Sequence, residues 1–142
     1  MKILALDLGD KWVGTAIADP LGITCRPYQT VELKELKPFL TKVIPLEGVG
    51  TVVVGYPKTV ATGGESDQTR RVVALKEELE RQLEVVDGKP VTWVLWDERL
   101  SSKRASEVQQ HRHDPESKKK SHSVAAAFIL QSYLDHLAFK RS

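Results

Sequence analysis

Two carboxylates at the ends of apolar stretches are the first residues of this chain that could do chemistry. Asp7 lies in LALDLGD, and Glu98 follows the apolar residues of WVLWDERLSS. A buried carboxylate is costly unless it is paired or binds a cation. If the two stretches are parallel strands of one sheet, both side chains reach the same edge, where ligands of such sheets collect.

Each carboxylate also has an ordinary structural interpretation. Asp7 can be a turn residue, since aspartate and glycine favour turns. Glu98 can be an acid at the start of a helix, stabilised by the helix dipole and by Arg99. Taken together, the two carboxylates suit a hard divalent cation, and no CxxC or HExxH pattern indicates zinc. A cation that activates water beside substrate phosphates would support phosphodiester hydrolysis.

A polar loop, YPKTVATGGESDQTRR, is a second candidate because it follows a strand and opens a helix. Thr62 and Glu65 have the spacing of a capping box, and Arg70 and Arg71 fall in the first helical turns. Backbone amides at such a helix start can hold a phosphate. The GK[ST] ending of a phosphate-binding P-loop is missing, so the pattern indicates phosphate binding only in general terms.

Basic residues are concentrated between positions 99 and 120, although the formal net charge of the chain is only +2. A solvated face is the ordinary interpretation of such a run. The alternative is a surface that grips a phosphate backbone without reading its sequence. Seven basic residues stand there against three acidic ones; the basic residues are Arg99, Lys103, Arg104, Arg112, Lys118, Lys119 and Lys120.

The bulk composition predicts one globular domain over residues 1–142. The chain is 41% hydrophobic and 28% charged, which is ordinary for a folded domain of this length. Its single cysteine, Cys25, excludes an internal disulfide and favours a reducing compartment. The first apolar run is short and contains an aspartate, unlike a signal peptide, and no apolar stretch has membrane-spanning length. We therefore expect a cytoplasmic protein.

The hydrophobic patterning predicts an α/β fold with a mixed five-stranded sheet and helices on both faces. The first three strands form an antiparallel meander, and the later ones alternate with helices and run parallel. The last helix is expected to bury Ala127, Leu130, Leu134 and Leu137. The strands are expected at about 2–8, 12–18, 23–31, 51–55 and 90–96, and the helices at 32–44, 65–83, 101–110 and 123–137, with a polar loop at 111–120.

Several segments occur in the order and spacing of one known family. LALDLGDKWVGTAIAD, VVVGYPKTVATGGESDQTRRV, WDERLSS and SVAAAFILQSYL together resemble the YqgF family of RuvX-type proteins. The family comprises Holliday junction resolvases and pre-16S ribosomal RNA nucleases, and the resemblance spans nearly the whole chain. It implies a ribonuclease H-like fold and a metal-dependent nuclease site of three acids.

The resemblance places two of those acids on Asp7 and Glu98 and the third at the start of the last helix. Family members read K-x-D there, whereas this chain has His122. Mg²⁺ prefers oxygen ligands, whereas Mn²⁺ accepts imidazole more readily. His122 can therefore be a metal ligand or an acid that contacts phosphate. Otherwise it marks a weakened site, or is a first-turn residue with Asp114 or Glu116 reaching in.

The resemblance also implies a nucleic-acid partner. We expect Lys118, Lys119 and Lys120, extended by Arg99, Lys103 and Arg104, to contact a phosphate backbone. Trp12 and Tyr56 could stack on bases, although packing is the simpler interpretation for Trp12.

The expected function is a metal-dependent endonuclease, using Mg²⁺ or Mn²⁺, in pre-16S rRNA processing. A Holliday junction resolvase, which would need a dimer, and a non-catalytic nucleic-acid-binding protein are the alternatives. An actin-like nucleotide-binding relative is disfavoured because the chain is short and lacks a second phosphate loop.

Overall fold

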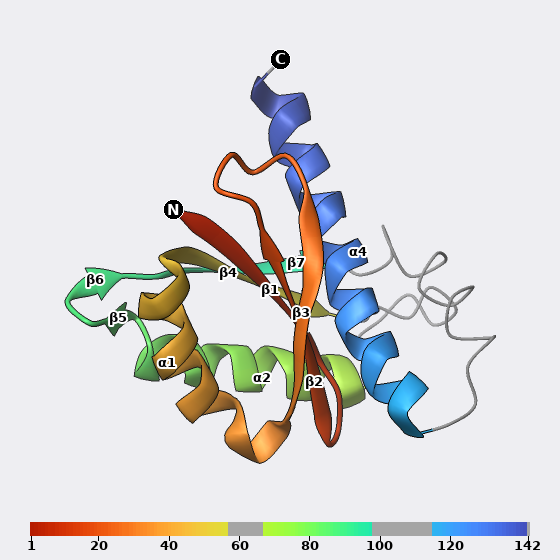
Figure 1. Ribbon diagram of the computed structural model, residues 1–142. Helices are drawn as coiled ribbons and strands as arrows, with labels where there is room; N and C mark the ends of the chain where they lie inside the picture. The colour runs from red at the N-terminus through yellow and green to blue at the C-terminus, as the bar shows by residue number, and fades with distance from the viewer. Residues whose placement is uncertain (57–66, 98–114, 142) are drawn as a thin grey trace.

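A five-stranded mixed sheet forms the centre of the protein, whose computed structural model describes residues 1–56, 67–97 and 115–141. The strand order is β3-β2-β1-β4-β7 (Figure 1). β1, β2 and β3 are antiparallel neighbours, and β4 lies parallel to both β1 and β7, which confirms the predicted arrangement. The strands are β1 (Lys2–Leu8), β2 (Trp12–Ala18), β3 (Cys25–Glu32), β4 (Val49–Tyr56) and β7 (Thr92–Asp97).

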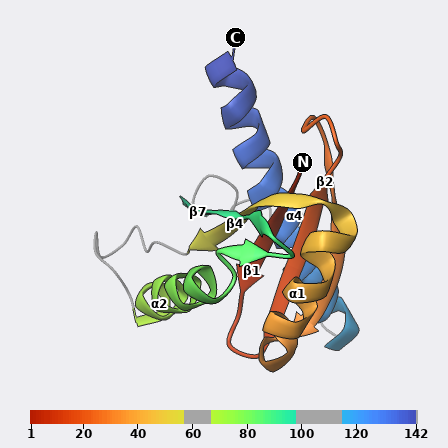
Figure 2. The ribbon, with the colours of Figure 1, turned by 90° about the vertical axis from the view of Figure 1, so that its left-hand side faces the viewer.

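Helices cover both faces of this sheet. A 3-10 helix, η1 (Leu33–Glu35), leads into α1 (Leu36–Glu47), and α1 and α2 (Asp67–Gln82) pack on one face. The long helix α4 (Pro115–Arg141) packs on the other, and its C-terminal turns extend beyond the sheet (Figures 1 and 2). Alternation along β1 separates the two cores, because Leu4, Leu6 and Leu8 face α1 and α2 whereas Ala5 faces α4.

The last helix differs from its prediction at both ends. It begins at Pro115 rather than near Ser123, so the expected polar loop at 111–120 is wrong from Pro115 onward. Proline suits a first helical turn because its missing N–H has no intrahelical partner there. The buried face also differs: Ala126, Ile129, Leu130 and Leu134 form it, whereas Ala127 and Leu137 are only half-buried. Small and apolar residues are adjacent in this part of the helix, so the sequence pattern did not distinguish which of two helical faces is buried.

Two smaller differences lie near prolines. Pro90 belongs to a small hairpin whose strands have two residues each, β5 (Val85–Val86) and β6 (Lys89–Pro90). It does not belong to the last strand of the main sheet. The predicted Asp87-Gly88 turn closes this hairpin, with φ angles of 52° and 76°. Helix α1 continues past Ile44, through Pro45, to Glu47, and Gly48 caps it with a φ of 70°.

The predicted helix over 101–110 lies outside the described residues, as do residues 57–66 of the polar loop predicted from Tyr56 to Asp67. None of the helices in the described part of the chain is long and apolar enough to cross a membrane.

Candidate active site

Asp7 lies at the centre of the sheet, between two glycines. In the strand register its partner on β2 is Gly14 and its partner on β4 is Gly55. Directly opposite residues point to the same face, so Asp7 and the open space above both glycines face α4. The Asp7 side chain is only 14% exposed. We call Gly14, Asp7 and Gly55 the glycine row.

The glycine row brings α4 into direct contact with the sheet. A Cβ on Gly14 would lie well inside 3.0 Å of the backbone C and O atoms of His122, a separation that real Cβ atoms do not show. A Cβ on Gly55 would overlap the side chain of Ile129 in the same way. A larger residue at position 14 would therefore lift α4 away from Asp7, whereas one at position 55 would displace the side chain of Ile129. This role of the glycines was not predicted, although glycines inside apolar strands are a signal of close backbone approach.

His122 completes a polar pair with Asp7. Its Nδ1 atom lies 3.3 Å from Oδ2 of Asp7, at the long end of the hydrogen-bond range, and its side chain is 30% exposed. With a proton on Nδ1 the imidazole donates to the carboxylate; with the proton on Nε2, both atoms offer lone pairs to a cation. His122 is the eighth residue of α4, so its interpretation as a first-turn residue is wrong.

The second predicted acid falls just beyond the described strand. β7 ends at Asp97, whose backbone pairs with that of Tyr56 in β4, and Glu98 is the next residue in the sequence. Glu98 itself lies outside the described residues. Within the ranges 1–56, 67–97 and 115–141, no group of three His, Cys, Asp or Glu side chains could hold a metal ion. The site that the structure describes therefore contains one carboxylate and one imidazole.

Of the predicted basic residues, two lie on α2 and three on α4. Arg70 and Arg71 occupy the first turns of α2 and are exposed, and Arg71 Nη1 lies 3.2 Å from Asp10 Oδ1. Residues Lys118–Lys120 lie within α4 and do not precede it, which corrects their predicted place. Arg99, Lys103 and Arg104, like Asp114, lie outside the described residues.

Aromatic side chains gather near the site, but mostly not where the sequence suggested. Trp12 begins β2 half-buried, with Lys11 Nζ 5.7 Å from its ring centroid, whereas Tyr56 is described only through its backbone in β4. Trp96, the register partner of Gly55, has ring centroids 5.3 Å from Tyr133 and 5.0 Å from His136. This aromatic group continues the glycine row, and strand alternation along β7 was the signal that could have found it.

The fold is that of the ribonuclease H-like resolvases. The structure of Thermus thermophilus RuvC in complex with a Holliday junction substrate matches with a TM-score of 0.64 and 10% identity, over 100% of this chain and 98% of that one. The fowlpox virus resolvase in complex with its substrate Holliday junction DNA matches with a TM-score of 0.53 and 14% identity. This match covers 96% of this chain and 99% of the resolvase chain. At these identities the likeness shows the fold alone.

Sequence comparison then identifies the family. The family model described as "RuvX: Holliday junction resolvase" matches residues 1–136, so the chain belongs to this family. A Caldicellulosiruptor bescii protein named "Putative pre-16S rRNA nuclease" is 37% identical over 139 residues, covering 95% of this chain and 96% of the relative. A protein of the same name from Lachnospira eligens is 36% identical over 143 residues, covering 95% and 97%. These findings confirm the predicted family and fold and agree with the predicted class of enzyme.

Proposed function

We propose that this chain, as one domain over residues 1–142, is a metal-dependent endonuclease that processes the precursor of 16S ribosomal RNA in the cytoplasm. The observation that carries the proposal is the 3.3 Å pair of Asp7 Oδ2 and His122 Nδ1 at the carboxyl end of the central strand. Glu98 directly follows the parallel strand β7 and is the third proposed member of the site. The names of the relatives support a precursor rRNA as the substrate.

The donor atoms of this site fit a divalent cation, and Mn²⁺ better than Mg²⁺. Asp7 supplies carboxylate oxygen, His122 supplies imidazole nitrogen, and Glu98 would supply a second carboxylate. Mg²⁺ demands oxygen ligands, whereas imidazole is acceptable to Mn²⁺. A bound cation would supply Lewis acidity toward water and the scissile phosphate. The packing of α4 on Gly14 would hold the His122 ring beside the Asp7 carboxylate, and β1 would keep that carboxylate mostly shielded from solvent.

Cleavage of a labelled precursor RNA tests the proposal. The wild-type chain should cut the RNA with Mn²⁺ and more slowly with Mg²⁺, whereas Asp7→Asn and Glu98→Gln should lose at least about 100-fold in rate, as expected for groups that stabilise the reacting centre. Asp87→Asn, in the exposed β5–β6 turn, is the matched control and should cut like the wild type. Equal cutting by wild type and Asp7→Asn with both metals would overturn the proposal.

A second candidate function is the resolution of Holliday junctions. The description of the matching family model and the fold shared with T. thermophilus RuvC favour it. Symmetric cutting of a four-way junction requires two related sites, hence a homodimer, whereas cutting one RNA strand needs only a monomer. Two measurements distinguish the two functions. One compares the cleavage of synthetic four-way DNA junctions with that of precursor RNA at equal enzyme concentration, and the other is the mass of the protein in solution. Binding of either substrate without cleavage would instead identify a non-catalytic member of the family.

A further inference from the structure

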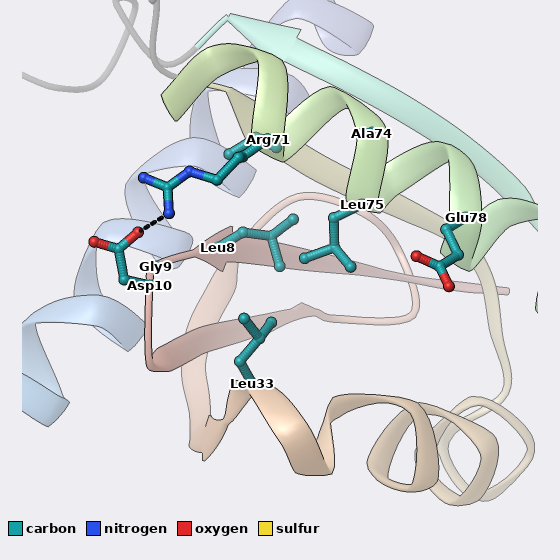
Figure 3. Close-up of a pocket in the computed structure, with 9 residues that line it drawn as sticks. Leu8, Gly9, Asp10, Leu33, Arg71, Ala74, Leu75 and Glu78 are labelled. Carbon is teal, nitrogen blue, oxygen red and sulfur yellow. Dashed lines mark ion pairs between the residues drawn. The ribbon is translucent and has the colours of Figure 1, made fainter. Parts of the chain in front are cut away.

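A pocket of about 330 Å³ lies close to the Asp7–His122 pair, between β1, η1 and α2 (Figure 3). In the figure Leu8, Leu33 and Leu75 point toward one another across it, and Val72 also lines it. Because Leu8 follows Asp7 in β1, the pocket opens on the sheet face opposite to α4. Because leucine and valine side chains line it, the interior of the pocket is mainly aliphatic.

One residue connects this pocket to the candidate active site. Gly9 lines the pocket, and a Cβ built on Gly9 would lie 3.1 Å from Cε1 of His122. The same Cβ would lie 2.6 Å from the carbonyl oxygen of Trp12, so the space beside Gly9 that a side chain would fill is bounded by Trp12 and by the imidazole of His122. Gly9 is therefore a residue that the pocket and the surroundings of His122 share.

Charged groups occupy the two ends of the pocket. At one end Arg71 Nη1 lies 3.2 Å from Asp10 Oδ1, and the two side chains are 68% and 77% exposed (Figure 3). An arginine has five N–H donors, and this pair leaves most of the guanidinium able to contact a second anion. Glu78 lies at the other end. The carboxylates of Asp10 and Glu78 disfavour a phosphate inside the pocket but can accept hydrogen bonds from N–H groups.

We propose that this pocket holds one unstacked base of the nucleic-acid substrate, while Arg71 contacts the phosphate of the same nucleotide. The inference rests on the proposed nuclease function and extends it to the kind of substrate. A nucleobase combines flat apolar faces with N–H donors on its edge, which matches aliphatic walls closed by carboxylates. A pocket of this volume is at the lower end of the range for small ligands, which suits one base. The preferred substrate then carries an unpaired nucleotide next to the cleaved bond.

Methyl-group NMR of the full chain, without metal, tests the base site directly. Each nucleoside 5′-monophosphate should shift the methyl resonances of Leu8, Leu33, Val72 and Leu75 in a saturable way. Ribose 5-phosphate, which keeps the phosphate and lacks the base, should leave them in place. A nucleotide titration that moves resonances elsewhere but not these four sets would overturn the inference.

Two variants and a control separate the pocket from its surroundings. Arg71→Ala, at an exposed position, should raise the dissociation constant of the nucleotides at least about tenfold, as expected for one lost charge-assisted hydrogen bond. Leu75→Trp should fill the pocket and abolish the shifts. Glu77→Trp adds the same bulk on an exposed position of α2 that does not line the pocket, and it should bind like the wild type.

Oligonucleotides distinguish a failed inference from a failed function. An RNA hairpin with one unpaired nucleotide should bind at least about tenfold more tightly than a fully paired one, and Leu75→Trp should remove that preference. The nuclease proposal stands if the wild type cleaves RNA and Asp7→Asn does not. If Leu75→Trp then cleaves both hairpins like the wild type, the base pocket is refuted. Methyl shifts caused by a protein partner but by no nucleotide would likewise refute it.

Discussion

The imidazole Nδ1 of His122 lies 3.3 Å from the carboxylate of Asp7, although 115 residues separate them in the chain. Gly14 accounts for this proximity. It is the register partner of Asp7 on β2, and its missing side chain is the space that the backbone of His122 occupies. The close packing of the last helix therefore determines which side chain meets the central carboxylate.

His122→Asp should exchange an imidazole for a second carboxylate next to Asp7. Without metal, like charges at this separation repel, so we expect the variant to melt at a lower temperature than the wild type. Millimolar Mg²⁺ should then raise its melting temperature by more than that of the wild type, because the site gains an oxygen ligand. Thermal unfolding with and without Mg²⁺ measures both effects.

His122→Gln is the neutral control for this experiment, since it removes the imidazole without adding charge. It should show neither the loss of stability without metal nor the larger gain with Mg²⁺. If Mg²⁺ stabilised the wild type as much as His122→Asp, the position would not face the cation and the proposed ligand set would be wrong.

Gly14→Ala should damage both stability and the site. The new Cβ would overlap the α4 backbone, which cannot move aside without leaving the core formed by Ile129 and Leu130. We expect a loss of at least about 2 kcal/mol in the free energy of unfolding. Urea denaturation measures this loss.

Gly50→Ala is the matched control for the glycine row. Its Cβ would lie 2.6 Å from the sulfur and 2.9 Å from the Cβ of Met1, a residue that is 78% exposed and can move aside. Its free energy of unfolding should stay within about 1 kcal/mol of the wild-type value, because alanine also costs less backbone entropy than glycine. Equal losses in the two variants would show that the α4 contact does not explain the requirement at position 14.

Glu47 ties the end of α1 to the start of β1. Lys2 Nζ lies 2.9 Å from its Oε1 atom, and the hydroxyl of Tyr28 donates to Oε2 at 3.1 Å. These hydrogen bonds, first that from Lys2, lower the pKa of the Glu47 carboxyl below its ordinary value of 4.5. Ionised Glu47 therefore contributes stability above pH 4.5, and the contribution is lost as the pH falls below that value.

Glu47→Gln should accordingly lower the melting temperature at pH 7 by more than at pH 3. Because the side chain is partly exposed, the effect at pH 7 should be modest. Glu77→Gln, at an exposed position of α2, serves as the reference and should change little at either pH. A difference between wild type and Glu47→Gln that does not depend on pH would contradict this account.

The sheet was predictable because its signals are local. Apolar strands of the observed length, turn residues and a later change to helical periodicity specify which segments are strands, with bounds correct to within a few residues. The strands of Asp7 and Asp97 do run parallel, as their placement required. Local sequence was less informative for α4, where Pro115 and the polar residues after it suit either a loop or a first helical turn.

The site was predictable in its residues but not in its geometry. The carboxylate of Asp7 is visible in the sequence as a charge inside an apolar strand. His122 was identified as a site residue only through the family pattern. Their pairing depends on Gly14 and Gly55, whose partners lie on a helix more than 70 residues away. A glycine inside a strand indicates a close approach but does not specify which segment approaches it. Strand alternation could have placed Trp96 on the α4 face, but its contacts with Tyr133 and His136 come from α4 and are not visible in the local sequence.

The single thiol of the chain should react slowly. Burial, followed by the charges of Asp135 and Asp19, raises the pKa of Cys25 from 9.0 to about 11. Its Sγ atom also lies 3.2 Å from the carbonyl oxygen of Ala127 in α4. The thiolate is the reactive form, so at pH 8 alkylation of the folded protein should be about 100-fold slower than that of the urea-unfolded chain. Mass spectrometry after timed exposure to iodoacetamide measures both rates.

Asp135→Asn isolates the electrostatic part of this effect. Removing the negative charge should lower the pKa of Cys25 and speed alkylation of the folded protein several-fold, while the unfolded rate stays the same. The variant should still protect the thiol relative to the unfolded chain, because burial is the larger cause. If the folded wild type were alkylated as fast as the unfolded chain, α4 would not cover Cys25. The packing of α4 on β2 and β3 would then have to be revised.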